Sequence, residues 1–188
     1  MENHRIVASE DEVTDKTIVD AAGLRVLPGL VDIHSHGAFG HDFSDADPEG
    51  LKIILKYEKS HGITSYCPTS MTLPAEELKE IFATIKTVGE MKDGAAVRGI
   101  NMEGPFINKE KKGAQKEEDI KLADIELFHK LQEAAGGLIK LVDLAPETEG
   151  AMECMYQSHI RWLIMIQQVK QSEKVPIISH ICIMRCHR

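Results

Sequence analysis

The sequence lacks most features that mark secreted, membrane-bound or nucleic-acid-binding proteins. Its four cysteines among 188 residues are too few for the disulfide framework of a small secreted domain. No apolar run is long enough to cross a membrane, and the acidic N-terminus lacks the apolar core of a signal peptide. The net charge of −8 argues against nucleic acid or an anionic membrane as a partner. We therefore expect a cytoplasmic protein that binds neither nucleic acid nor a membrane.

Glycine-rich nucleotide-binding loops are also missing, because neither G-x-G-x-x-G nor G-x-x-x-x-G-K-[ST] occurs in the chain. What the chain does contain is an alternation of strand and helix patterns, which predicts a parallel sheet. Four such units are half of an eight-stranded (β/α)8 barrel of the TIM type, and we favour this partial barrel over an open doubly wound sheet. The expected elements are a strand at Gly29–His34, a helix at Pro48–His61, a strand at Ile63–Cys67, a helix at Pro74–Met91, a strand at Val97–Met102, a helix at Ile125–Ala135 and a strand at Leu138–Leu144.

Three regions of different character divide the chain. Residues 1–27 carry short β-branched runs at Arg5–Ala8, Thr17–Asp20 and Leu24–Leu27, and we expect them to be the remnant of a small β-sandwich subdomain. Residues 28–153 form the predicted half-barrel. Residues 154–188 break with the rest in composition, because Glu173 is their only acidic residue while they hold three of the four cysteines.

The segment PGLVDIHSHG, residues 28–37, places His34 and His36 at the end of an apolar strand. Side chains two residues apart on a strand point to the same face, so both imidazoles should project together. In a parallel barrel this end of the strands carries the active site. A bare H-x-H pair also occurs in ordinary polar turns, so its surroundings must decide between the two interpretations.

A carboxylate follows another predicted strand, because NMEGPF places Glu103 between apolar residues and a Gly-Pro turn. Taken alone, Glu103 is equally well explained as a capping or salt-bridging residue. Together with His34 and His36 it would form an open divalent-metal site built from the tips of different strands.

Five segments in order resemble N-acetylglucosamine-6-phosphate deacetylases of the amidohydrolase superfamily. They are PGLVDIHSHG, the SHGIT–CPTSMT stretch, NMEGPFI, KKGAQ and LIKLVDLAPE, and the resemblance runs from about Ile6 to Glu153. It implies a (β/α)8 barrel with a small β-sandwich, one or two bound metal ions such as Zn or Fe, and a homodimer in the full-length family. It also implies hydrolysis of the acetamide of N-acetylglucosamine 6-phosphate, an amino-sugar phosphate.

The resemblance also assigns roles by position. Glu103 matches the central metal-binding glutamate of the family, and His34 and His36 match the pair that binds a second metal in some members. Ala114 and Gln115 match a loop that contacts the sugar, although the family often has His where this chain has Gln115. The family's acid/base Asp follows the last barrel strand, beyond the end of this chain, so we assign no catalytic residue here.

The resemblance ends where the composition changes. Codons that are permitted for Ser158–Gln171, read from the third base, can spell SHTVADYDTASEA, and those for Glu173–Arg188 can spell KGANHITHLYNAMPP. Both strings follow the family pattern in a single frame. We therefore expect residues 154–188 to be an out-of-frame tail and the chain to be inactive as it stands. The alternatives are another metal-dependent amidohydrolase and a non-catalytic product of a damaged gene.

Overall fold

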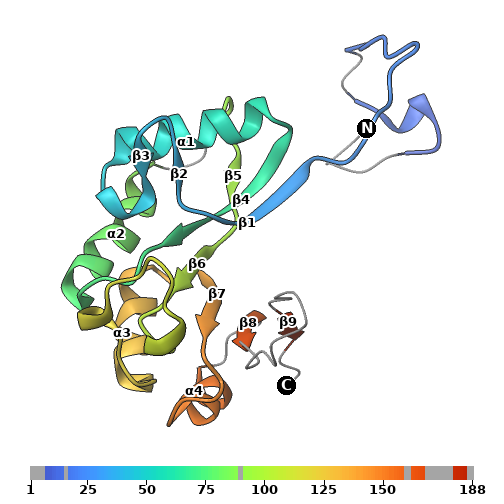
Figure 1. Ribbon diagram of the computed structural model, residues 1–188. Coiled ribbons are helices and arrows are strands. Elements are labelled where there is room, and N and C mark those ends of the chain that lie inside the picture. Colours follow the sequence, from blue (N-terminus) through green and yellow to red (C-terminus); the bar gives the residue numbers. More distant parts are fainter. Residues whose placement is uncertain (1–6, 15–16, 89–90, 159–161, 168–179, 186–188) are drawn as a thin grey trace, which may run out of the picture.

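A computed structural model describes residues 7–14, 17–88, 91–158, 162–167 and 180–185, the last two segments by their backbone alone. It contains a mixed α/β arrangement in which βα units follow one another along a largely parallel sheet (Figure 1). The strands are β1 (Leu30–Ser35), β2 (Gly37–Ala38), β3 (His41–Asp42), β4 (Ile63–Ser70), β5 (Ala96–Val97), β6 (Ile100–Glu103), β7 (Ile139–Leu144), β8 (Trp162–Gln167) and β9 (His180–Arg185). The α-helices are α1 (Pro48–Ser60), α2 (Ala75–Val88), α3 (Ile125–Ala134) and α4 (Ala151–Gln157), and short 3-10 turns lie at Glu10–Glu12, Phe43–Asp45, Lys109–Lys111 and Glu117–Asp119.

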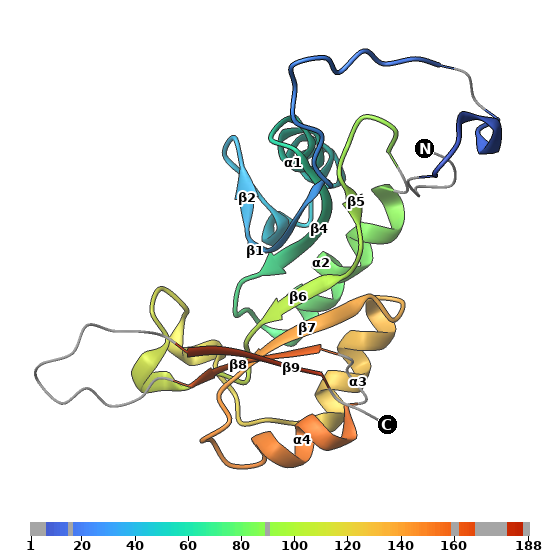
Figure 2. The same ribbon diagram turned by 90° about the vertical axis from the view of Figure 1, so that its right-hand side faces the viewer.

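The main sheet has the order β1-β4-β6-β7-β8-β9, with β5 paired to β4 at its side (Figure 2). All of these pairs are parallel except β8 with β9. The prediction of an α/β fold with a parallel sheet and a partial barrel is therefore confirmed. Within the described part of the chain, no helix is both long and apolar enough to span a bilayer.

Local signals explain where the first helix begins and ends. The Asp47 side chain accepts hydrogen bonds from the amides of Glu49 and Gly50, and Pro48 occupies the first helical position. The helix stops before Gly62, whose φ of +83° suits a residue without a side chain.

The hydrophobic core lies between the sheet and its helices. Helices α1, α2 and α3 line the same side of the sheet in Figure 1, and their apolar faces belong to one buried cluster with the strands. Besides Ile139 at the start of β7, the cluster takes every second residue on β6 and β7, namely Ile100, Met102, Val142 and Leu144. The alternate positions therefore face the other side of the sheet, where polar side chains gather.

The boundaries of β4 and β6 differ from the predicted ones. Strand β4 continues through Pro68 to Ser70, pairing with β1 on one side up to Pro68 and with β6 on the other side from Thr69. The strand expected at Val97–Met102 is two strands, β5 and β6, and the Arg98 amide just after β5 still donates to the Tyr66 carbonyl on β4.

The short strands expected in residues 1–27 are not formed where the structure describes this segment. Apart from one 3-10 turn, residues 7–14 and 17–29 are loops and bends that lead away from the sheet (Figure 1). Ile18, Val19 and Val26 are 76–91% exposed, and residues 17–29 belong to neither described sheet. Residues 1–6 lie outside the described part.

The three-region division stays a prediction. Helix α4 runs across the expected boundary between residues 153 and 154, and Cys154 within it is buried. Beyond it the backbone of β8 continues the parallel sheet beside β7. The out-of-frame origin of residues 154–188 stays a prediction as well.

Candidate metal centre

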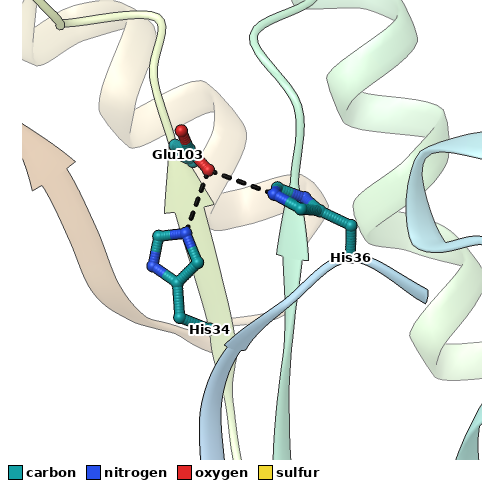
Figure 3. A group of neighbouring side chains, drawn as sticks. All are labelled: His34, His36 and Glu103. Carbon is teal, nitrogen blue, oxygen red and sulfur yellow. Dashed lines mark hydrogen bonds and ion pairs between the residues drawn. The ribbon is translucent and has the colours of Figure 1, made fainter. Parts of the chain in front are cut away.

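His34, His36 and Glu103 converge at the carboxyl ends of β1 and β6. The Nε2 atoms of His34 and His36 lie 3.1 Å and 3.3 Å from the same Glu103 oxygen, Oε2 (Figure 3). Strand β4 lies between β1 and β6 in the sheet, so the two histidines reach across it. The structure thus brings together the three side chains that the sequence predicts as metal ligands.

The donor atoms of these residues suit a small divalent cation. One atom from each side chain lies within 4.8 Å of the other two, and two of the separations are 3.1 Å and 3.3 Å. Four donors at about 2.1 Å around a tetrahedral zinc ion would be roughly 3.4 Å apart. Two imidazoles and a carboxylate are ligands that Zn and Fe accept. The histidine side chains are 38% and 32% exposed, which leaves room for further ligands or water.

Mutual pairing shifts the protonation of the cluster. The hydrogen bond to Glu103 raises the pKa of both His34 and His36, against the effect of partial burial. Burial alone would raise the pKa of Glu103, but hydrogen bonds from His34, His36 and Gln115 outweigh it and hold that pKa well below its usual range. A carboxylate that stays ionised is ready to bind a cation.

Atoms outside the cluster fix how the ligands point. The Thr69 carbonyl accepts a hydrogen bond from Nδ1 of His36 at 3.0 Å. The side-chain NH2 group of Gln115 donates to Oε1 of Glu103 at 2.8 Å, and its side-chain oxygen accepts from the backbone N–H of Thr72 at 2.7 Å. Because Oε1 is held by Gln115, only Oε2 of Glu103 faces the two imidazoles.

A buried polar layer lies beside His34. Asp143 on β7 is paired in register with Glu103 and is fully buried, with Oδ2 at 3.4 Å from His34 Nδ1. Burial raises the pKa of Asp143 to about 7, against the nearby charge of His34, which lowers it. Neither Asp143 oxygen has a hydrogen-bond partner among the described residues, and the same holds for Oδ1 of Asn101. Sequence analysis missed Asp143 because it lies inside the apolar-looking run LVDLAPE.

A cavity of 360 Å³ opens beside the cluster. Its walls include His36, Glu103, Lys111, Ala114 and Gln115. Ala114 and Gln115, the predicted sugar contacts, therefore lie next to the candidate metal ligands, and Gln115 is itself 4% exposed. Their contact with a sugar stays a prediction, as does metal binding by the other three residues.

Comparison with known proteins finds curated relatives that carry the name N-acetylglucosamine-6-phosphate deacetylase. The sequence matches no protein-family model. It is 37% identical over 146 residues to the N-acetylglucosamine-6-phosphate deacetylase of Bacillus subtilis. The matched region covers 76% of this chain and 37% of that enzyme. The enzyme of the same name from Bos taurus is 35% identical over 139 residues, 71% of this chain and 34% of its own length.

Solved structures agree with the sequence relatives. A substituted form of the N-acetyl-D-glucosamine-6-phosphate deacetylase from Mycobacterium smegmatis, determined with N-acetyl-D-glucosamine 6-phosphate, superposes with a TM-score of 0.65 at 25% identity. The superposition covers 73% of this chain and 36% of that one. The chain spans about a third of the length of the curated relatives it matches. By sequence and by structure, the chain is related to the N-acetylglucosamine-6-phosphate deacetylases over that third of their length.

Proposed function

We propose that this chain carries part of the active site of a metal-dependent deacetylase that acts on N-acetylglucosamine 6-phosphate in amino-sugar catabolism. The observation that carries the proposal is the convergence of His34, His36 and Glu103 on one edge of a parallel sheet, beside a 360 Å³ cavity. The M. smegmatis relative binds this sugar phosphate, which supports the same substrate class here. We propose one or two ions, zinc or iron, because imidazole and carboxylate donors suit both metals.

The residues present would have different roles in such a site. A divalent ion bound here would lower the pKa of a water molecule to roughly 7 and polarise the acetamide carbonyl. His34, His36 and Glu103 would hold the ion, while Gln115 keeps Glu103 aimed at it. Ala114 and Gln115 would contact the sugar from the cavity wall.

Proton transfer to the leaving amine requires a further acid/base group. The family resemblance assigns this role to an Asp that this chain does not contain. We therefore propose that the 188-residue chain binds metal but has little or no turnover. For a full-length deacetylase built on this segment, we propose that two copies form a homodimer and that the enzyme is cytoplasmic.

Zinc titration of the metal-free chain tests the site. Competition with a chromophoric chelator should show one or more tightly bound ions, with affinity reduced at least tenfold in Glu103→Gln, which loses the anionic donor but keeps the shape. His129→Asn is the matched control, because His129 is exposed on α3 and remote from the cluster. Equal affinity in the Glu103→Gln variant would rule out the proposed centre.

Substrate choice separates the deacetylase from another amidohydrolase. The zinc-loaded chain and a frame-corrected version should each be titrated with N-acetylglucosamine 6-phosphate, unphosphorylated N-acetylglucosamine and a cyclic amide. We expect binding of the sugar phosphate by both, and acetate release from the corrected version alone. Turnover of the cyclic amide in place of the sugar would favour the second function.

The damaged-gene alternative has its own tests. Sequencing the gene through the codons for Cys154 to Arg188 should reveal a shifted frame. An uninterrupted frame would contradict the out-of-frame tail. A cooperative thermal transition of the purified chain would oppose the view that it does not fold.

A further inference from the structure

The two candidate histidine ligands differ in what holds the second ring nitrogen. Nδ1 of His36 lies 3.0 Å from the Thr69 carbonyl oxygen. A carbonyl can only accept, so this nitrogen carries a proton, and in the neutral ring the lone pair stays on Nε2, the atom that faces Glu103. Once Nε2 loses the proton that it donates to Glu103, the Thr69 carbonyl keeps His36 in the Nδ1-protonated tautomer that a cation bound beside Glu103 requires.

His34 has two neighbours at its Nδ1. The Asn101 amide nitrogen lies at 3.3 Å and Asp143 Oδ2 at 3.4 Å. Asn101 also donates from the same nitrogen to the Ile33 carbonyl at 3.0 Å, which fixes its NH2 group toward His34. The Asn101 NH2 group can only donate to Nδ1, which leaves the ring proton on Nε2 beside Glu103 in the metal-free protein. The opposite tautomer, which frees Nε2 for a cation, needs an acceptor at Nδ1, and of these two neighbours only Asp143 can accept.

Building on the proposed metal centre, we propose that Asp143 is a positioning residue. Its carboxylate lies 3.4 Å from Nδ1 of His34 without a hydrogen bond in the metal-free protein, and it would accept the Nδ1 proton in the tautomer that presents the Nε2 lone pair to a divalent cation beside Glu103 Oε2. Metal-bound histidines almost always donate their other N–H group to a carboxylate or a carbonyl. His34 and His36 would then be oriented in the two usual ways, one by Asp143 and the other by the Thr69 carbonyl.

The burial of Asp143 supports a role of this kind. A carboxylate taken out of water without hydrogen bonds destabilises the fold, and an apolar residue would fill the same place without that cost. Asp143 is 0% exposed, and neither oxygen has a hydrogen-bond partner among the described residues. Its register beside Glu103 aims it at the cluster rather than at the helices.

Zinc affinity of the full chain tests the inference. Asp143→Leu removes the acceptor while keeping a buried side chain of similar size, and we expect affinity to fall about 10–100-fold. Asp143→Asn keeps a neutral oxygen that can still accept, so it should restore part of the loss. Asp93→Asn is the control, because Asp93 is an exposed carboxylate in the loop after α2 and forms an ion pair with Lys56 of α1.

A second readout distinguishes positioning from general stability. In the zinc-bound wild type, ¹⁵N spectra of the His34 ring should show Nδ1 protonated and Nε2 bound to the metal, with faster exchange of the Nδ1 proton in Asp143→Leu. Thermal melting of the metal-free variants gives the fraction of each protein that is folded, and each zinc affinity is corrected for that fraction. Zinc affinity of folded Asp143→Leu equal to that of wild type would overturn the inference alone, as would zinc bound through Nδ1. A wild type that binds no zinc would overturn the metal centre itself.

Discussion

The turn that follows Glu103 has no room for a side chain, and replacing Gly104 by Ala measures how firmly the turn holds the carboxylate. Gly104 has a φ of +76°, and a Cβ atom there would lie 2.0 Å from Oγ1 of Thr72. That oxygen donates to the Glu103 carbonyl at 3.2 Å, and Thr72 is 1% exposed. The added methyl group must therefore displace Thr72, the Glu103 backbone or both.

The structure sets the size of the effect in two parts. An alanine in the left-handed region costs about 1–2 kcal/mol, and overpacking a rigid buried site costs about 1–3 kcal/mol. Gly104→Ala should thus lower the free energy of unfolding by about 2–5 kcal/mol. Thr72→Ala loses a hydrogen bond and a buried methyl group, together about 2 kcal/mol. It also removes the obstructing atoms, so the double variant should be about 1–3 kcal/mol more stable than the sum of the single effects predicts.

Urea unfolding of the metal-free chain and its variants is the assay. Gly113→Ala is the matched control, because Gly113 has a φ of +59° and a methyl group added there would meet no atom within 4 Å. It should show the conformational cost alone, about 1–2 kcal/mol. Zinc titration of folded Gly104→Ala should show weaker binding, since the carboxylate moves with its backbone. A loss no larger than that of Gly113→Ala, or strict additivity with Thr72→Ala, would refute the steric argument.

Three further predictions follow from the same contacts. In metal-free protein, pairing raises the pKa of His34 and His36 and lowers that of Glu103. The ion pairs therefore stabilise the fold fully between pH 4.5 and pH 6.5, the pKa values of Glu and His in the unfolded chain. This stabilisation is lost as pH rises through the imidazole pKa values or falls through the carboxyl pKa; a pH-independent difference in unfolding free energy between wild type and Glu103→Gln would contradict this. Gln115→Ala should lower stability by about 2 kcal/mol in urea unfolding, because it strands a carboxylate oxygen and a buried amide; a change near zero would count against the proposed hold on Glu103. Burial raises the pKa of the Cys67 thiol to about 11, so mass spectrometry should find this residue unlabelled by a thiol reagent until the chain unfolds; rapid labelling of the native chain would show that it is accessible.

The ligands of the candidate site were predictable because they depend on local rules. Two residues on a strand share a face, which brings His34 and His36 together. The carboxyl ends of parallel strands meet at one edge, which brings Glu103 to them. Periodicity also located helices α1, α2 and α3 to within three residues at either end.

Other features depend on contacts between distant segments and could not be predicted from local patterns. The break between β5 and β6 arises where Gly99 packs against Lys140, whose Cγ would lie 2.5 Å from a Cβ at that glycine. Pro68 lies inside β4 at the residue where pairing with β1 on one side ends, just before pairing with β6 on the other side begins. The β-branched residues near the N-terminus gave a strand pattern, but a strand forms only where another strand pairs with it.

The atoms that orient the candidate ligands come from elements other than those that carry them. Thr69 on β4 holds His36, Gln115 from the loop after β6 holds Glu103, and Asp143 on β7 is placed to hold His34. Since β4 lies between the two ligand strands, the cluster depends on its register with both neighbours. A slip of one residue would turn every side chain of β4 to the opposite face and move the Thr69 carbonyl away from His36. The metal centre is thus a property of the sheet as a whole, and an H-x-H motif on a strand without this neighbour would lack the support that fixes its tautomer.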